Sequence, residues 1–254
     1  MKKLLFGALL SVTFLFSASP EQIEKYLDIS NSDEELVMLE SQFSAMQSSI
    51  NAMSQTKSDE KSVEQSNYDM QLLSIRFKEK LQSLLSDDEL DEILKNYNNR
   101  VLLQFVSATS DPDYDEKAAK TYVTNLEKNS EAKERIELVT NISKELYSRE
   151  SMVILFDNLM KPMMKNAIGG DKMDSALMKE SRESYVKMLS EASKIETIYS
   201  TREFTIEDLE ELYKISKTSA IDHETKAVYK AMAYALKDFF LSMSSRYDIE
   251  KHKR

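Results

Sequence analysis

Glycine and proline are so scarce in this chain that its backbone has few points at which a regular helix must stop. The 254 residues include three glycines and three prolines, and residues 21–111 contain neither. Both residue types mark turns, and an all-β protein needs turns at close and regular spacing. We therefore expect a helical protein, and a hydrophobic fraction of 41% is sufficient to build its core.

Apolar residues recur at intervals of three and four along most of the chain, the spacing of one face of an α-helix. Ser86 and Glu89 have the spacing of a capping box, in which a hydroxyl and a carboxylate accept hydrogen bonds from N–H groups at a helix start. Ser32 and Glu35 repeat that spacing. We predict an all-α protein of eight to ten amphipathic helices. The clearest apolar stripes are Leu36 to Met53, Leu90 to Phe105, Ile136 to Leu146, Met152 to Met163 and Val228 to Met243.

Turn-forming residues divide the helices at a few points. Asp111-Pro112-Asp113 is expected to end one helix and open another, and Gly169-Gly170-Asp171 forms the clearest loop. Pro162 is expected to kink a helix that runs from Ser148 to Ile168, with a new helix beginning near Pro162 as the alternative.

The first 19 residues have the three-part form of a secretory signal peptide. Lys2 and Lys3 precede an apolar run, and small residues follow it from Ser17 to Ser19. The run of about 13 residues is shorter than the roughly 20 that a membrane helix needs. We expect cleavage between Ser17 and Pro20, a periplasmic mature protein and no stable membrane span after signal removal; a retained N-terminal anchor is the alternative.

Charge and cysteine content exclude further classes. The chain has no cysteine, so neither a disulfide framework nor lipid attachment through an N-terminal cysteine is possible. The net charge is −10, and it becomes −12 when the two lysines of the signal peptide are removed. Such a balance repels phosphate backbones, so we expect no nucleic-acid partner.

A faint internal repeat of about 115 residues favours a duplicated architecture. Four segments of the first half match segments of the second half in the same order. The matched pairs are Ile23 to Ser30 with Ile136 to Ser143, Leu36 to Leu39 with Met152 to Leu155, Leu85 to Leu90 with Phe204 to Leu209, and Asp113 to Ala118 with Asp222 to Ala227. We predict two similar helical units, residues 20–129 and 130–254, after the signal peptide of residues 1–19.

One string in the second half carries a family resemblance. Its residues are Tyr199, Phe204-Thr205, Asp208-Leu209 and Leu212. With the exported N-terminus, they resemble a family of exported proteobacterial proteins whose helical domain has no assigned function and begins a helix with F-T-x-x-E-L. That family continues with an aromatic pair and S-P-x-G-x-K, where this chain has Ile215-Ser216 and Thr218-Ser219. The resemblance implies an all-α periplasmic protein and no reaction.

Groups that could perform catalysis are few. The chain lacks a nucleophile on a glycine-framed turn, and its two histidines are His223, beside Asp222, and His252, in a basic tail. No zinc-peptidase, di-iron or Walker pattern is present. Acidic neighbours such as Glu207-Asp208 and Glu210-Glu211 are typical of solvated helix faces. We expect no enzyme and no cofactor, and an enzyme that uses carboxylates alone is the least favoured hypothesis.

Asp111, Asp113 and Asp115 occupy the first, third and fifth positions of a calcium-loop pattern. The rest of the pattern fails, because Glu116 stands where the loop needs glycine and Tyr122 stands where a glutamate should close the site. The competing interpretation places Asp113, Asp115 and Glu116 at a helix N-terminus, where they offset the positive end of the dipole. We predict no metal site.

Methionine is concentrated in one part of the chain: seven of the 14 lie between Met152 and Met188. Flexible thioethers fill gaps in a core, line surfaces that accept varied apolar partners, or bind Cu(I). No histidine or cysteine accompanies the stripe, which favours core packing over copper. The candidate apolar binding region is Met152, Phe156, Met160, Met163 and Met164.

These features favour a non-enzymatic exported protein that binds a macromolecular partner, most simply another protein, in the periplasm. The alternative is a chaperone-like or carrier module that holds apolar peptides or lipids at the Met-rich region.

Overall fold

The computed structural model describes residues 17–34, 36–39, 41, 72–111, 113–168 and 175–246. In these residues the protein is all-α and has no β-strand, which confirms the predicted class. They form eleven α-helices, slightly more than predicted. The helices are α2 (Pro20–Ile29), α4 (Leu72–Leu84), α5 (Asp87–Asn96), α6 (Arg100–Thr109), α7 (Glu116–Leu126), α8 (Lys133–Leu146), α9 (Arg149–Leu155), α10 (Lys161–Ile168), α11 (Ser175–Ser200), α12 (Ile206–Ser216) and α13 (Ser219–Arg246), with a 3-10 turn η1 (Ser130–Ala132) and a π-helical segment η2 (Phe156–Met160).

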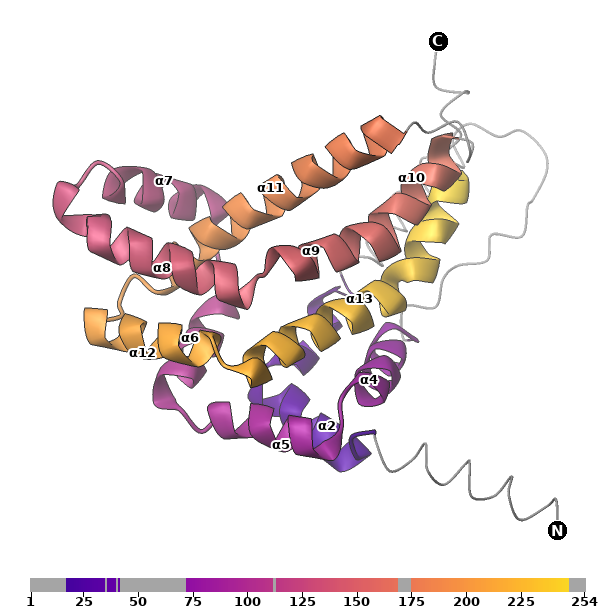
Figure 1. Cartoon of the computed structure of the whole chain (residues 1–254), viewed down its shortest axis with the longest axis horizontal. Helices are drawn as coiled ribbons and strands as arrows, with labels where there is room; N and C mark the ends of the chain where they lie inside the picture. The colour runs from indigo at the N-terminus through magenta and orange to yellow at the C-terminus, as the bar shows by residue number, and fades with distance from the viewer. Residues whose placement is uncertain are drawn as a thin grey trace.

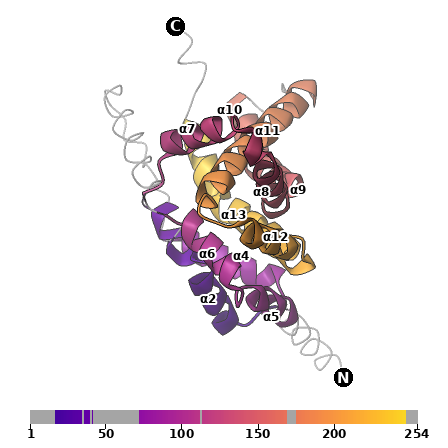
Figure 2. The same ribbon diagram turned by 90° about the vertical axis from the view of Figure 1, so that its left-hand side faces the viewer.

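Helices α12 and α13 lie between two groups of helices (Figures 1 and 2). One group comprises α2, α4, α5 and α6, and the other comprises α7 to α11. Helix α13 packs on α4 and α5 from the first group and on α8, α9 and α10 from the second. Helix α13 therefore joins the two groups, and α12, which packs on α6 and α8, joins them as well.

The contact between α13 and α4 pairs small side chains with large ones. Helix α13 carries a stripe of buried alanines at intervals of four, Ala227, Ala231 and Ala235. Helix α4 carries Phe77 and its buried neighbours Leu73 and Leu81 at the same interval. Small side chains such as alanine allow two helix axes to approach closely. The buried residues of both helices belong to the same hydrophobic core.

The stripe from Leu90 to Phe105 was predicted to lie on one helix, and this prediction is wrong. Its members are all buried, but α5 ends at Asn96 and α6 begins at Arg100. Asn99 caps α6, since its side-chain oxygen accepts hydrogen bonds from the N–H groups of Val101 (2.8 Å) and Leu102 (3.3 Å). An asparagine competes with the helical backbone in this way and starts a new helix. The extra break raises the helix count above the predicted range.

The other local predictions are mostly confirmed. The capping box at Ser86 and Glu89 is present, and the Ser86 hydroxyl accepts a hydrogen bond from the Glu89 N–H at 3.3 Å. Helix α6 ends and α7 begins on either side of Asp111 and Asp113, as expected. Glu35, most of the stripe to Met53, Gly169-Gly170-Asp171 and His252 lie outside the described residues.

The residues before α2 are fixed in the fold. The Ala18 side chain is 1% exposed, and the Ala18 N–H donates to the Leu85 carbonyl at 2.7 Å. Ser19 caps α2 through its side-chain oxygen, and its N–H donates to Asp87 Oδ1 at 2.7 Å. The chain is therefore anchored between α4 and α5 before its first described helix begins.

The buried side chains form one hydrophobic core that draws on both halves of the sequence. Helices α5 and α12 both begin at a capping box, at the positions that the internal repeat matches. The last matched pair differs, because Asp115 caps α7 whereas its counterpart Glu224 lies inside α13. The repeat and the division at residues 129 and 130 remain predictions. In the described part of the chain no helix is long and apolar enough to cross a membrane.

Candidate functional site

The candidate site lies beside a change of helix type. Helices α9, η2 and α10 follow one another without a loop, and the Lys161 N–H donates to the carbonyl of Phe156, five residues earlier, as in a π-turn. Pro162 follows at once and explains the location. A proline cannot donate to the carbonyl four residues before it, and its ring crowds that carbonyl. The widened turn accommodates both effects, so the helix continues through Pro162. The kink expected at this proline stays a prediction.

Helices α10 and α11 diverge next to this π-turn. Helix α10 packs on α13, whereas α11 packs mainly on α7 and α8 (Figure 1). The first buried side chain of α11 is Val186, so residues 175–185 lie on the molecule without sinking a side chain into its core. The first three turns of α11 therefore form one wall of an open space.

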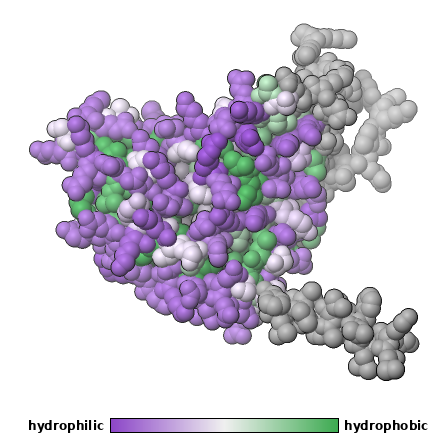
Figure 3. Space-filling view, viewed as in Figure 1, coloured by the Kyte–Doolittle hydropathy of each residue, from purple (hydrophilic) through white to green (hydrophobic). Residues whose placement is uncertain are grey.

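This space is a groove of about 450 Å³ that we call the α10–α11 groove. Two of its apolar side chains are well exposed: Leu177 is 48% and Met188 is 60% accessible to solvent. Apolar surface is visible at this place, between α11 and the α9–α10 helix (Figure 3). The lining residues are Phe156, Met160, Met164, Leu177, Glu180, Ser181, Ser184, Tyr185 and Met188.

The Met-rich stripe is divided between the core and the groove. Phe156, Met160 and Met164 line the groove, and the Phe156 ring lies 5.7 Å from the Tyr185 ring. Met152 is 1% exposed, and its sulfur accepts a hydrogen bond from the Ser190 hydroxyl at 3.3 Å. Met163 is half-buried and does not line the groove. Phe156 is also 1% exposed, so it forms the floor of the groove next to the core, and Met160 and Met164 lie beyond it on the groove side.

The charged side chains near the groove are exposed, and the ion pairs between them are long. Asp157 lies 3.9 Å from Lys161 on its own helix and 3.8 Å from Arg182 on α11. All three side chains are more than one-third exposed, so these pairs contribute little to stability. Burial against the aromatic neighbour raises the pKa of Tyr185, which therefore stays neutral and presents a largely apolar ring.

Two aspartates of the calcium-loop pattern, Asp111 and Asp115, accept hydrogen bonds from nearby backbone N–H groups. Asp115 caps α7 by accepting hydrogen bonds from the N–H groups of Lys117 (2.8 Å) and Ala118 (3.1 Å). Asp111 accepts one from the N–H of Asp113 at 2.9 Å. This bears out the helix-start interpretation. Within the described ranges, no group of three or more histidine, cysteine, aspartate or glutamate side chains could hold a metal ion.

The remaining polar candidates have structural contacts. His223 is exposed, and its Nδ1 lies 3.5 Å from Glu89 Oε1 at the start of α5. Asp208 completes the capping box of α12 and pairs with Arg100 at 2.6 Å, and this pairing, with the Thr205 N–H, lowers the pKa of its carboxyl. Of the other acidic neighbours, Glu211 accepts a hydrogen bond from the Asn99 amide at 2.5 Å.

A buried carboxyl that the sequence analysis missed lies at the other end of the molecule. Glu224 on α13 is 7% exposed, and its Oε1 accepts hydrogen bonds from the hydroxyls of Tyr26 (2.8 Å) and Tyr97. Burial raises the pKa of Glu224 to about 7, and the two hydrogen bonds offset only part of that effect. The sequence contains one sign of this burial: Glu224 lies three residues after Ile221 and four before Val228, on the apolar face of its helix.

The Glu224 cluster of Glu224, Tyr26 and Tyr97 lacks the access that a catalytic site needs. Oε2 of Glu224 is sealed from solvent and has no hydrogen-bond partner among the described residues. The two tyrosine rings close around Oε1 in an edge-to-face pair with centroids 6.0 Å apart. A substrate could not reach either oxygen without separating α2 and α5 from α13. We therefore treat the cluster as part of the scaffold and the α10–α11 groove as the candidate site.

Comparison with known protein families, with curated proteins and with solved structures finds no match to this chain. The resemblance carried by Phe204 to Leu212 thus stays a prediction, and the function must be argued from the site.

Proposed function

We propose that this protein is an exported, non-enzymatic helical protein that binds a partner protein in the periplasm, and that the α10–α11 groove receives an apolar helical segment of that partner. The observation that carries the proposal is the pair of exposed side chains, Leu177 and Met188, on the wall of a hollow whose floor is Phe156 and Met160. Exposed apolar surface that lines a concavity is typical of an interaction site.

The openness of the groove favours a protein segment over a lipid chain. A bound small molecule usually has most of its surface enclosed. Leu177 and Met188 are about half exposed or more, so an acyl chain would keep one side in water. An amphipathic helix brings its own polar face and covers the groove while it inserts apolar residues. The divergence of α10 and α11 provides two walls for such a third helix.

The side chains of the groove suit a partner whose contacts vary in detail. Met160, Met164 and Met188 are unbranched and polarizable, and they adapt to different apolar shapes at low cost. Ser181, Ser184 and Glu180 supply a polar edge on α11. π-helical turns also recur at functional sites, and η2 contributes both Phe156 and Met160.

The cellular part of the proposal rests on the sequence. The basic start, the apolar run and the small residues before Pro20 support export. The non-enzymatic part rests on the roles of the candidate acids and His223, which cap helices or form exposed pairs. The matched capping boxes of α5 and α12 support an origin of the fold from two related units.

A defined peptide tests the groove without knowledge of the natural partner. The probe is a fluorescent amphipathic helical peptide of about 16 residues with leucines on one face. A scrambled peptide of the same composition without an apolar face is its control. Affinity is measured by fluorescence anisotropy with the wild type, with Leu177→Glu/Met188→Glu and with Ile75→Glu. Ile75 is 52% exposed on α4, so its variant adds a charge to an apolar site outside the groove.

We expect binding of the amphipathic peptide alone, a loss of about tenfold or more in the double groove variant, and no change in Ile75→Glu, since buried apolar contacts dominate such interfaces. Equal affinity for the two peptides, or equal losses in the two variants, would overturn the proposal.

A further inference from the structure

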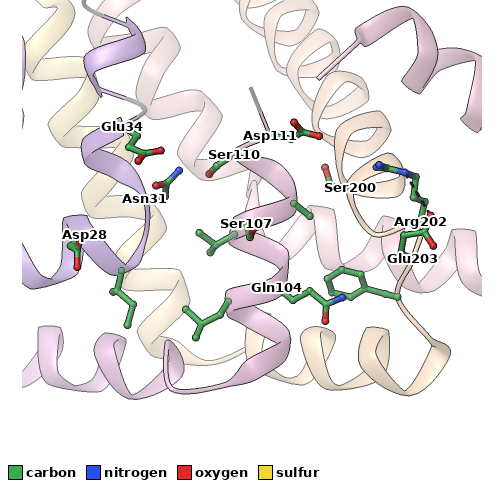
Figure 4. Close-up of a pocket in the computed structure, with 15 residues that line it drawn as sticks. Asp28, Asn31, Glu34, Gln104, Ser107, Ser110, Asp111, Ser200, Arg202 and Glu203 are labelled. Carbon is green, nitrogen blue, oxygen red and sulfur yellow. Dashed lines mark ion pairs between the residues drawn. The ribbon is translucent and has the colours of Figure 1, made fainter. Parts of the chain in front are cut away.

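A second hollow of about 790 Å³ lies over α6, and it shares no lining residue with the α10–α11 groove. Figure 4 shows residues from the end of α2 on one side of α6 and residues 200–203 on the other. The volume lies within the range of small-molecule sites. Leu103 is 38% exposed in this hollow, and Ile29, Val106 and Phe204 complete an apolar floor.

One wall of the hollow is held by an arginine from another helix. The guanidinium of Arg135 on α8 donates to the carbonyls of Phe204 (2.8 Å) and Thr201 (2.5 Å). These carbonyls follow the end of α11, where a positive charge is favourable. The turn that carries Ser200, Arg202 and Glu203 is therefore fixed without help from a ligand.

The charges that line the hollow are mostly negative. Four carboxylates line it, Asp28, Glu34, Asp111 and Glu203, against the single guanidinium of Arg202. The Arg202 guanidinium already contacts its own segment: it donates a hydrogen bond to the Tyr199 carbonyl at 2.9 Å and lies 4.2 Å from the centre of the Tyr199 ring. Glu203 lies 3.9 Å from Arg202 and pairs with it. The uncompensated negative charge of the hollow is therefore that of Asp28, Glu34 and Asp111.

A buried hydroxyl gives an independent sign of a ligand. Ser200 is 4% exposed, and its Oγ has no hydrogen-bond partner among the described residues. In Figure 4 this oxygen points from the end of α11 toward α6, into the hollow. An unpaired buried polar group costs about 1–3 kcal/mol, so a partner that enters the hollow would recover part of that cost.

The lining defines the class of ligand. A metal ion needs several carboxylates at one point, and among the described residues no three such side chains could hold one. A sugar would need an exposed aromatic face, and Phe204, the aromatic residue of this lining, is 4% exposed. A chain of methylenes with ammonium groups would place its charges at the carboxylates and its hydrocarbon on the floor.

We propose that the hollow over α6 binds a linear organic polyamine, with its ammonium groups at Asp28, Glu34 and Asp111 and one N–H group directed at Ser200 Oγ. This site is separate from the α10–α11 groove and does not depend on its function.

Calorimetric titration with spermidine tests the site. We expect saturable binding of one molecule per chain and a loss of about tenfold or more in Asp28→Asn/Glu34→Gln, since each removes a charge-assisted contact. The matched control is Glu207→Gln/Glu210→Gln, which removes the same charge from the exposed face of α12 and should bind as the wild type does. Mg²⁺ at the same concentration should not compete, because it cannot span the floor.

The Ser200→Ala variant separates a binding role from a structural one. Removal of an unpaired hydroxyl should raise the melting temperature of the free protein, while it weakens spermidine binding by about threefold to tenfold. Absence of saturable binding, equal losses in the two acidic double variants, or competition by Mg²⁺ would overturn the proposal. So would a Ser200→Ala protein that binds spermidine as tightly as the wild type.

Discussion

The Glu224 cluster and the α10–α11 groove are built from the same kind of amphipathic helix, yet one is sealed and the other is open. At Glu224, helix α2 and the end of α5 close over α13 and enclose even a carboxyl group. At the groove, α10 and α11 each pack on other helices and leave Leu177 and Met188 exposed.

The difference shows that closure depends on the number of helices around a stripe rather than on the stripe itself. The stripe of α13 at Glu224 is covered from two sides, so a polar side chain on it must find hydrogen bonds inside the protein. The apolar stripe of α10 has α13 on one side and the groove on the other. Four experiments can break or sharpen this comparison.

The largest effect should come from the closed region. Phe77→Ala removes a side chain that is 1% exposed, in the helix that packs along the alanine stripe of α13. We expect a loss of about 3–5 kcal/mol in the free energy of unfolding, because a cavity remains where the ring was. Urea denaturation followed by circular dichroism measures it. A loss under about 1 kcal/mol would contradict the packing of α4 on α13.

The second effect is the pH dependence that Glu224 confers. Its pKa is about 7 in the folded protein, raised from 4.5, so between these values the folded state holds a proton that the unfolded state has released. Stability from this group is thus greatest below pH 4.5 and falls as the pH rises to 7, by up to about 3 kcal/mol.

Glu224→Gln isolates this contribution, because the amide keeps a hydrogen-bond acceptor and does not titrate. Between about pH 5 and pH 8, the wild type should lose stability relative to Glu224→Gln, as measured by urea denaturation at each pH. Parallel curves for the two proteins would show that the carboxyl is not enclosed as described.

The third effect concerns the N-terminal edge of the closed region. Ser19→Ala removes the cap of α2 and should lower the free energy of unfolding by about 1 kcal/mol, measured by urea denaturation.

The same edge predicts where the mature protein begins. Because Ala18 is buried and Ser19 is the cap, and because we propose export, we expect the mature protein to begin at Ala18. Intact-mass spectrometry of the exported protein reads this end directly, and a start at Pro20 would contradict the anchoring role of both residues.

The smallest effect on stability should come from the open region. Leu177→Ala and Met188→Ala each should change the unfolding free energy by less than about 0.5 kcal/mol, since neither side chain is buried.

Hydrogen exchange should be faster for the amides of residues 175–185 than for the second half of α11, where Thr197 and Ile198 are buried. Slow exchange throughout α11 would indicate that the groove is covered in solution.

Sequence patterns predicted those features that depend on neighbours along one helix. The capping box at Ser86 and the helix start near Asp115 depend on residues within three or four positions of each other, and both are present. The break at Asn99 was missed, because the apolar spacing from Leu90 to Phe105 continues across it.

Features that depend on distant segments could be predicted only in part. The methionine stripe indicated the region of the groove, but α11 supplies Tyr185 and Met188, and no local signal pairs them with Phe156. The hollow over α6 unites α2, α6 and the turn after α11, which are far apart in sequence. The enclosure of Glu224 required knowledge of Tyr26, which lies 198 residues away.

The π-turn at Phe156–Met160 also sets the rotation of α10 relative to α9. Such a turn holds one residue more than regular α-helical hydrogen bonding accommodates. Each residue of an α-helix turns the next by about 100°, so deletion of one residue from the turn would rotate the side chains of α10 by about that angle relative to those of α9. Met164 would then leave the wall that it forms with Leu177 and Met188, so the length of this turn decides which face of α10 lines the groove.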